Sequence, residues 1–372
     1  MKIMFWVSVC VITYTYVGYP LWLYVGSRLF AKPIHAAAYF PTVSVIMAVR
    51  NEADVLPRKL QNLLALQYPA GQMEIIVVSD GSTDATKQVL STFTSDSLRA
   101  IIQVRHEGKA SALNQAIREA RGEIVVFTDA RQMIEPGALK HLMAKFADPS
   151  VGGVTGELIL DKSAAGKSLE GVGLYWKLEK KIRQWEASIG SVVGATGAFY
   201  AVRRNLLVTL PAGVILDDVY LPLQVVRQGY RMAFESQAVA RESLQSSAAQ
   251  EFRRKVRTLT GNYQLLQLAP WLLTRSNPLR FQFVSHKLLR LLAPFALGSA
   301  LLCAFLIPEG FYRLAAALQL FVYGSGVLAL VRPKLRPFGP LPDAAFAFVL
   351  MNTAAIVALV NFVTGRKPVW VR

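Results

Sequence analysis

Four long stretches of this chain carry no charged side chain, and they lie toward its two ends rather than in its middle. They are Ile3–Gly26, Leu291–Pro308, Leu314–Val331 and Ala344–Gly365. A membrane-spanning helix needs roughly 20 apolar residues, with about 17 as a lower limit, so the first and last stretches are long enough and the middle two are close to the limit. A buried core helix is the alternative for any one stretch, but three in succession favour a C-terminal membrane region.

The first stretch is interpreted as a retained membrane anchor. A cleaved signal peptide is the alternative, but the apolar run exceeds the roughly 7–15 residues of a signal-peptide core. Only Lys2 precedes the run, whereas Arg28 and Lys32 follow it, and this charge bias predicts that the following chain is cytoplasmic. If all four stretches span, the basic C-terminal sequence GRKPVWVR lies on the opposite side. A re-entrant last segment, or an interfacial Leu291–Pro308 segment, would remove that conflict.

The charge balance is strongly basic, with 41 Lys and Arg against 24 Asp and Glu and a formal net charge of +17. Much of the excess lies beside the apolar stretches, in EFRRKVRT, SHKLLR, VRPKLRP and GRKPVWVR. Basic residues in this position are typical of contact with anionic membrane lipids. No nucleic-acid motif accompanies them, so no nucleic-acid partner is expected. The two cysteines, Cys10 and Cys303, both lie in apolar stretches, which argues against a disulfide framework or a thiolate zinc site.

The middle of the chain alternates short apolar strands with amphipathic helices. Strand signals occur in VSVIMAV, MEIIVVSD, AIIQVR and GEIVVFTDA, and helix signals in VLPRKLQNLLALQ, DATKQVLSTF and GKASALNQAIREA. This alternation predicts a doubly wound, mostly parallel α/β sheet. Ligands of such sheets bind beyond the carboxyl ends of the strands, where this sequence has the polar clusters RNE, DGSTD and TDAR. A dinucleotide-binding Rossmann fold is disfavoured, because no G-x-G-x-x-G follows the first strand.

Two further segments bear on the chemistry. The sequence LDDVYLPLQVVRQGYR places Asp217 and Asp218 at or just before the start of a helix, where they can cap the helix, a role that does not exclude a chemical one. The glycine-bearing segment GATGA (Gly194–Ala198) either lets backbone approach a ligand closely or is a plain turn. Before it, Trp176, Leu178, Ile182 and Trp185 lie at helical spacing in an amphipathic helix, and we interpret this stripe as core rather than as a sugar platform.

In these motifs the chain resembles the family 2 glycosyltransferases with a GT-A fold, in the membrane-anchored branch that includes cellulose, hyaluronan and chitin-oligosaccharide synthases. The resemblance covers roughly Val43–Gly261. It implies a set of site residues, with Asp218 as the general base and Asp217 beside it, and with Asp129 as the ligand of a divalent cation, Mg²⁺ or Mn²⁺. The residues that it assigns to the nucleotide-sugar are Glu52, Asp80, Gly108, Lys109 and Asp129, and those on the acceptor side are Gly194 and Gly197.

The chain departs from the family pattern at two motifs. The second aspartate of the D-x-D element is Arg131, which cannot ligate a cation, so either Asp129 and the diphosphate hold the metal with water or another carboxylate, or Arg131 neutralises phosphate charge directly. In place of the Q-x-x-R-W motif of processive synthases the chain has Arg254 and Thr258 around a retained Arg257. We expect Arg254 and Arg257 to bind the nucleotide-sugar. The missing tryptophan argues against processive polymerisation.

Together these observations predict a multi-pass protein of the inner or plasma membrane that is an inverting glycosyltransferase. It would move a sugar from a nucleotide donor, a UDP-hexose or UDP-N-acetylhexosamine, to a lipid-linked or growing polysaccharide. The expected division is a transmembrane anchor in residues 1–30, a cytoplasmic catalytic domain in 38–250, interfacial amphipathic helices in 251–280 and a C-terminal transmembrane region in 281–372. Two alternatives stay open: a processive synthase with a secretion tunnel, which would require membrane partner subunits or a homo-oligomer, and a non-catalytic nucleotide-binding membrane subunit.

Overall fold

The polar middle of the chain forms one eight-stranded mixed sheet. The computed structural model describes residues 1–161, 170–243, 248–331 and 340–366. Much of VRPKLRP and GRKPVWVR, two of the basic sequences named above, therefore lies outside the described residues. The strands are β1 (Val43–Val49), β2 (Met73–Asp80), β3 (Leu98–Gln103), β4 (Ile124–Thr128), β5 (Met133–Ile134), β6 (Val151–Asp161), β7 (Phe199–Arg203) and β8 (Arg231–Ser243). Their order across the sheet is β3-β2-β1-β4-β7-β6-β8-β5.

The first half of the sheet has the predicted parallel arrangement. Strands β3, β2, β1 and β4 are all parallel neighbours, with Val43 of β1 opposite both Met73 of β2 and Ile124 of β4. Beyond β4 the sheet is mixed, because β7 runs antiparallel between β4 and β6, while β6 and β8 are parallel. The prediction of a doubly wound, mostly parallel sheet is therefore confirmed.

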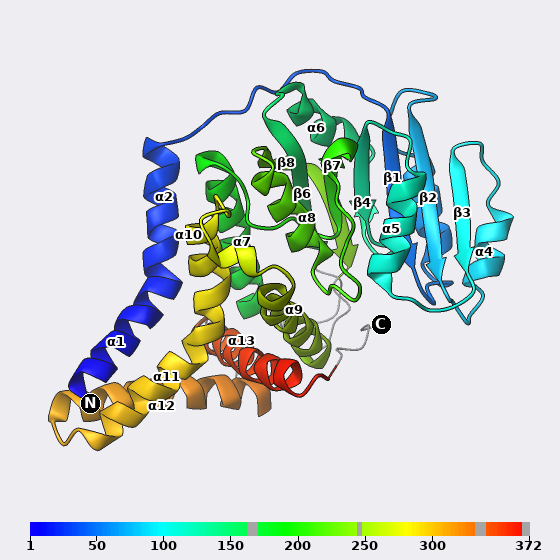
Figure 1. The fold of residues 1–372 in the computed structure, drawn as a ribbon. Helices are drawn as coiled ribbons and strands as arrows, with labels where there is room; N and C mark the ends of the chain where they lie inside the picture. The colour runs from blue at the N-terminus through cyan, green and yellow to red at the C-terminus, as the bar shows by residue number, and fades with distance from the viewer. Residues whose placement is uncertain (162–169, 244–247, 332–339, 367–372) are drawn as a thin grey trace.

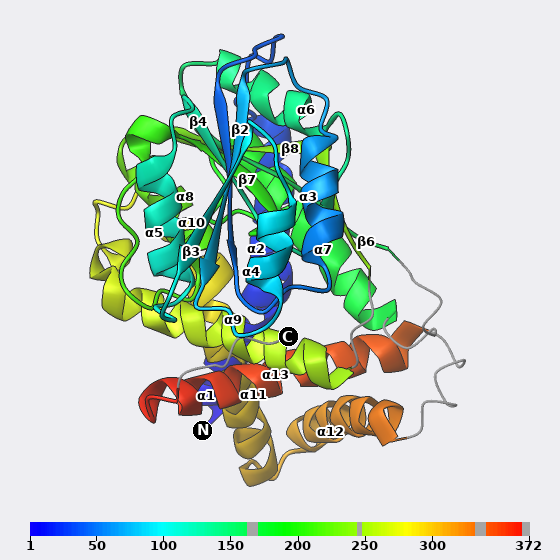
Figure 2. The same cartoon turned by 90° about the vertical axis from the view of Figure 1, so that its right-hand side faces the viewer.

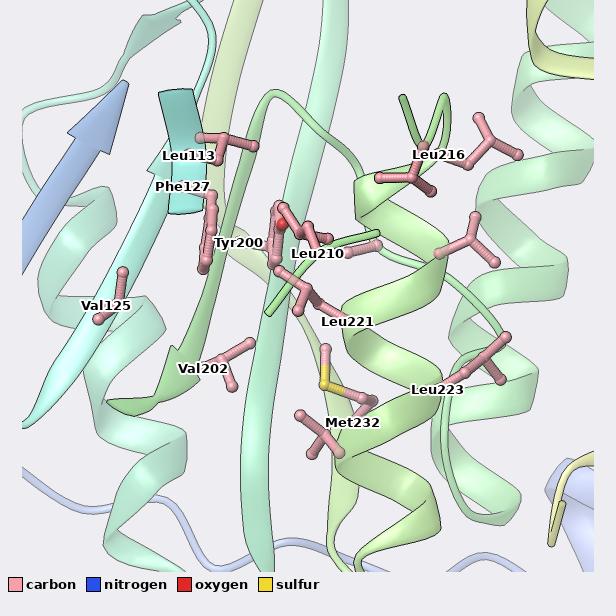
Figure 3. Close-up of a cluster of buried hydrophobic side chains, with 14 of the residues drawn as sticks. Leu113, Val125, Phe127, Tyr200, Val202, Leu210, Leu216, Leu221, Leu223 and Met232 are labelled. Atoms are coloured by element: carbon pink, nitrogen blue, oxygen red, sulfur yellow. The ribbon is translucent and has the colours of Figure 1, made fainter. Parts of the chain in front are cut away.

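Helices cover both faces of this sheet, which explains why its central strands are apolar on both sides. Figure 2 shows the sheet nearly edge-on, with α5 and α8 on one side and α3 and α4 on the other. On the α5 and α8 side, Phe127 of β4 stacks on Tyr200 of β7 with ring centroids 4.5 Å apart, within the cluster of buried side chains in Figure 3. The helices of this part are α3 (Leu56–Leu64), α4 (Thr86–Thr92), α5 (Lys109–Glu119), α6 (Ala138–Ala144), α7 (Glu170–Ile189) and α8 (Asp217–Arg227), with short 3₁₀ turns η2 (Lys145–Ala147) and η3 (Arg204–Leu206).

The described residues contain four helical segments long and apolar enough to cross a membrane: Lys2–Leu29, Arg280–Leu306, Gly310–Leu328 and Ala344–Val363. Figure 1 shows the first as an arm joined to β1 by a long connection, and shows α13 side by side with α9, below the sheet. The elements are α1 (Lys2–Thr13), η1 (Tyr14–Gly18), α2 (Tyr19–Leu29), α9 (Ala248–Leu268), η4 (Pro270–Leu273), α10 (Arg280–Phe283), η5 (Val284–Leu288), α11 (Leu289–Leu306), α12 (Gly310–Val331) and α13 (Pro340–Val363).

Helix α7 packs on the N-terminal arm. Its Ile182 is fully buried against Tyr19 and Leu23 of α2, and Trp185 lies at the edge of the same cluster. Leu178, on the same predicted stripe, is exposed instead, and the side chain of Trp176 lies outside the described residues. The stripe therefore serves packing, as predicted, but its partner is the apolar arm rather than the core of the sheet.

Candidate active site

The loops after β1 and β2 are bound to each other at the carboxyl edge of the sheet. Asn51 adopts a left-handed backbone conformation (φ 53°), which asparagine tolerates better than most residues. Its side-chain Oδ1 accepts a hydrogen bond from Thr83 N (2.7 Å), and its backbone N–H donates to Ser82 Oγ (3.1 Å). The RNE and DGSTD clusters, which the sequence predicts at one edge of the sheet, are therefore joined there by hydrogen bonds.

Asp80 shapes the loop that leads to Lys109. The Asp80 side chain is buried, and its carboxylate accepts hydrogen bonds from Glu107 N (2.7 Å) and Gly108 N (3.0 Å), while His106 Nδ1 lies 2.7 Å from Oδ2. The loop reaches this position because residue 81 is a glycine: a Cβ there would lie 2.4 Å from the His106 backbone nitrogen. Asp80 thus holds the residues just before α5, and a direct contact between Asp80 and a nucleotide stays a prediction.

Lys109 is surrounded by carboxylates from two distant segments. Its Nζ lies 3.0 Å from Asp129 Oδ1, at the end of β4, and 3.2 Å from Asp217 Oδ1, in the first turn of α8. Burial opposes the charge on Lys109, but Asp129, Asp217 and Asp218 outweigh burial and raise its pKa. Arg257 of α9 lies close enough to oppose protonation of Lys109. The structure therefore brings together five of the predicted site residues.

Asp218 lies beside Asp217 at the start of α8. Neither aspartate forms a side-chain cap, so the capping interpretation is not supported, and Asp217 faces Lys109 instead. Burial, followed by the neighbouring Asp217 carboxylate, raises the pKa of Asp218 to about 6, while Lys109 opposes this rise. A carboxylate whose pKa approaches the working pH is suited to general base catalysis.

The GATGA loop lies against these acids. Ala195 N donates to the backbone oxygen of Asp218 (2.7 Å), and a Cβ built on Gly194 would lie 3.0 Å from Val219 Cγ2. A Cβ on Gly197 would lie 3.2 Å from Asp218 Oδ2 and 3.6 Å from Asp129 Oδ2. Gly197 therefore borders both carboxylates, and the absence of a side chain leaves the space beside them open.

Arg131 and Arg254 are each paired with a protein carboxylate. Arg131 binds Glu52 through Nη2 to Oε1 (3.3 Å) and Nε to Oε2 (3.5 Å), which joins the loops after β4 and β1. Arg254 of α9 lies 2.9 Å from Glu242 Oε2 at the end of β8. These arginines and Glu52 therefore lie in ion pairs, and their contacts with a nucleotide stay predictions.

The donor set fits a divalent cation only if the substrate completes the site. Among the described residues, no three His, Cys, Asp or Glu side chains are grouped as metal ligands. Asp129 offers one carboxylate, which faces Lys109 through Oδ1 and borders Gly197 through Oδ2. Mg²⁺ is commonly held by one or two carboxylates together with substrate phosphates and water. Asp129 meets this requirement, and Arg131 adds no ligand.

Sequence reasoning missed two residues next to this site. Lys59 of α3 is fully buried, and its Nζ donates to Thr128 Oγ1 (2.9 Å) and to the Gln132 carbonyl (2.6 Å), at the two ends of the turn that carries Asp129. Burial lowers the pKa of Lys59 to about 7. The sequence feature that could have identified Lys59 is its position on the apolar face of α3, three residues after Leu56. The second missed residue is Tyr200, whose pKa is raised by burial and then by the nearby Asp217 and Asp218.

Comparison with known proteins identifies the domain that carries Asp80, Lys109, Asp129 and Gly197. Residues 44–208 match the model of glycosyl transferase family 2. The chain contains a family 2 glycosyltransferase domain. Poly-β-1,6-N-acetyl-D-glucosamine synthase of Staphylococcus aureus (strain MSSA476) is 26% identical over 230 residues, and a probable glycosyltransferase of Bacillus subtilis (strain 168), YdaM, is 28% identical over 236 residues. Each alignment covers 60% of this chain and 55% of the relative, so the chain matches about half the length of these curated relatives.

The fold of the glycosyltransferase domain and of the helices around it is shared with a solved structure. The mannosyltransferase PcManGT from Pyrobaculum calidifontis, solved in complex with GDP-mannose and Mn²⁺, superposes with a TM-score of 0.74 and 24% sequence identity. The match covers 98% of this chain and 100% of the mannosyltransferase chain. The expected GT-A-type α/β fold with additional apolar helices is therefore confirmed.

Proposed function

We propose that this chain is a membrane-integrated, inverting glycosyltransferase that moves a sugar from a nucleotide donor to a lipid-linked or growing glycan. The donor expected from the family resemblance is a UDP-hexose or UDP-N-acetylhexosamine. The observation that carries the proposal is the convergence of Asp129, Lys109 and Asp218 beside Gly197, with the pKa of Asp218 raised to about 6. Such a cluster pairs a base with a cationic group, as transfer to a hydroxyl requires.

In the proposed reaction Asp218 accepts the proton of the acceptor hydroxyl. The acceptor oxygen forms a bond to the anomeric carbon of the donor, and the bond from that carbon to the diphosphate breaks. The electron pair leaves with the nucleoside diphosphate, whose charge Lys109 and Arg257 stabilise. A single displacement of this kind inverts the anomeric configuration. A divalent cation held by Asp129 would supply further charge stabilisation on the diphosphate.

The surroundings of the domain support an acceptor that is presented at a membrane. Helix α9, which carries Arg254 and Arg257, packs against the apolar helix α13. The charge bias of Lys2 against Arg28 and Lys32 supports a cytoplasmic catalytic domain. We therefore keep the division into an anchor (1–30), a catalytic domain (38–250), interfacial helices (251–280) and a membrane region (281–372) as part of the proposal.

The test is nucleoside diphosphate release by the purified protein in detergent, with a panel of UDP-sugars and GDP-mannose and with Mn²⁺ or Mg²⁺. Asp218→Asn should abolish release from the donor that the wild type uses. Asp148→Asn is the matched control, because among the described residues the Asp148 carboxylate accepts hydrogen bonds from Ser150 and from the backbone N–H of His35, neither of which is a predicted site residue. Nucleotide binding without turnover on any donor would support a non-catalytic subunit instead. Mass spectrometry of the product distinguishes a single added sugar from a polymer.

A further inference from the structure

A buried carboxylate joins the apolar helices to the acceptor-side loop. Glu186 of α7, only 3% exposed, accepts at Oε1 a hydrogen bond from the Tyr19 hydroxyl of α2 (2.7 Å), and His286 Nδ1 of η5 lies 2.8 Å from the same oxygen. The second oxygen, Oε2, accepts from the backbone N–H of Val193 (3.4 Å), one residue before the GATGA loop. Three segments far apart in the sequence therefore meet at one side chain.

A second carboxylate holds the other side of the same imidazole ring. Nε2 of His286 lies 3.1 Å from Glu179 Oε2, and Glu179 is also paired with Arg290. Burial opposes ionisation of both carboxyl groups, but the charged neighbours, with His286 common to both, outweigh burial and lower the pKa of Glu179 and of Glu186. The two carboxylates therefore contact the two nitrogens of the His286 ring, one on each side.

The two helical segments that carry Tyr19 and His286 are both irregular near these residues. Both α1–α2 and α10–α11 contain a π-helical turn, η1 (Tyr14–Gly18) and η5 (Val284–Leu288), and Tyr14 in the first is 2.9 Å from Ser285 in the second. Single π-helical turns inside longer helices occur frequently at functional sites. Tyr19 follows the first of these turns directly, and His286 lies within the second.

The loop that follows Val193 is also hydrogen-bonded to the backbone of Asp218, the proposed base. Val193 leads directly into Gly194, Ala195 N donates to the Asp218 backbone oxygen, and Thr196 N donates to Thr155 Oγ1 (2.9 Å). A displacement of Val193 therefore changes the position of the loop relative to Asp218. The described contacts form a continuous chain from α2 and η5, through Glu186, to the acceptor side of the site.

We propose that Glu186 is a positioning residue that ties the acceptor-side loop, Val193–Ala198, to the apolar helices through Tyr19 and His286. The tie sets where the hydroxyl of a membrane-borne acceptor meets Asp218, so the inference rests on the proposed function. Glu186 does not touch the reacting atoms and acts through the loop. It affects acceptor binding rather than donor binding.

The decisive variant is Glu186→Gln, because its amide can still accept from Tyr19 and His286 but turns an N–H group toward the Val193 N–H. We expect hydrogen–deuterium exchange of the amides in residues 192–198 to rise at least about fivefold, while exchange in β1 and β2 stays unchanged. Tyr14→Phe is the matched control: it breaks a hydrogen bond between the same two helices that does not reach the loop. Unchanged exchange in Glu186→Gln, or an equal rise in Tyr14→Phe, would overturn the proposal.

A kinetic measurement separates positioning from general destabilisation. With the donor that the wild type uses, Glu186→Gln should raise KM for the acceptor about tenfold and leave donor KM and hydrolysis of the donor by water unchanged. A uniform loss of all three would contradict the proposal. If Glu186→Gln does not fold, Tyr19→Phe removes one hydrogen bond without changing a charge and should give a smaller effect in the same direction. If the wild type turns over no donor, the proposed function fails, and the exchange experiment still decides whether Glu186 holds the loop.

Discussion

The ammonium group of Lys109 lies 3.0 Å from Asp129 Oδ1. A protein cation therefore lies beside the Asp129 turn, which we expect to contact the diphosphate. Lys109 lowers the pKa of Asp218, and in the proposed reaction it also supplies positive charge to the leaving group. Lys109→Met removes both. We expect kcat to fall about 10²–10³-fold, in the range seen when one preorganised charge-stabilising group is lost, and the acid limb of the pH–rate profile to move to higher pH. Measurement of kcat/KM between pH 5 and 9 tests this, and an unshifted limb would count against it.

We expect the ionised Asp218 side chain to lower the free energy of unfolding at neutral pH. Its folded pKa of about 6 lies above the ordinary value of 3.8, so its favourable contribution is complete below pH 3.8 and is lost as pH rises through 6. Asp218→Asn should therefore raise the free energy of unfolding at pH 8 by about 2 kcal/mol while it abolishes transfer. Thermal unfolding in detergent at pH 8 and pH 5 is the measurement. The gain should be smaller at pH 5, and a Tm that falls equally at both values would contradict the assignment.

Arg131 can be tested as the residue that changes metal use. Arg131→Asp places a second carboxylate in the D-x-D position and should lower the Mn²⁺ concentration that gives half-maximal activity, because it adds an oxygen ligand. Arg131→Gln is the control, since it breaks the pair with Glu52 without adding a carboxylate. The same Mn²⁺ dependence in both variants would show that position 131 does not face the cation.

Gly197 should be required for activity but not for folding. A methyl group there would lie 3.2 Å from Asp218 Oδ2 and fill space beside Asp129, and the Gly197 backbone is not in the left-handed region, so alanine adds no backbone strain. Gly197→Ala should reduce kcat/KM at least about 10²-fold through misplacement of the acceptor, with a Tm within a few degrees of the wild type. Gly190→Ala is the control, because a Cβ at residue 190 has no neighbour within 4 Å.

Lys59 is expected to matter for stability and for its pH dependence. Lys59→Met leaves Thr128 Oγ1 and the Gln132 carbonyl without their donor and should cost about 2 kcal/mol. In the wild type the folded pKa of about 7 lies below the ordinary 10.5, so the unfolded chain binds more protons between these values and stability rises with pH there. Thermal unfolding between pH 7 and 9 should show this rise in the wild type and a flatter profile in Lys59→Met. Parallel profiles would contradict it.

Local patterns predicted much of the site. The order of strands and helices from Val43 to Thr128 follows from short apolar runs separated by amphipathic segments, and strands that are parallel neighbours must end at one edge. For that reason the RNE, DGSTD and TDAR clusters, the last of which contains Asp129, could be predicted to lie at one edge, whereas Lys109 was assigned only through the family resemblance. The antiparallel insertion of β7 between β4 and β6 could not be predicted, because parallel and antiparallel neighbours both satisfy the backbone N–H and C=O groups of a strand, although with different patterns of hydrogen bonds.

The amino-acid sequence by itself determined the class of fold and the apolar segments, because these depend on periodicity and on side-chain type. Its motifs also supplied the candidate site residues, through the resemblance to a known family. Only the tertiary structure decided what those residues face. In the structure Arg131 is paired with Glu52, and the Asp80 carboxylate accepts hydrogen bonds from backbone amides. Lys59 donates to the turn that carries Asp129. Glu186 contacts both Tyr19 and His286. These contacts link positions up to 167 residues apart, and partners at that separation are selected by packing and by the need to satisfy buried polar groups.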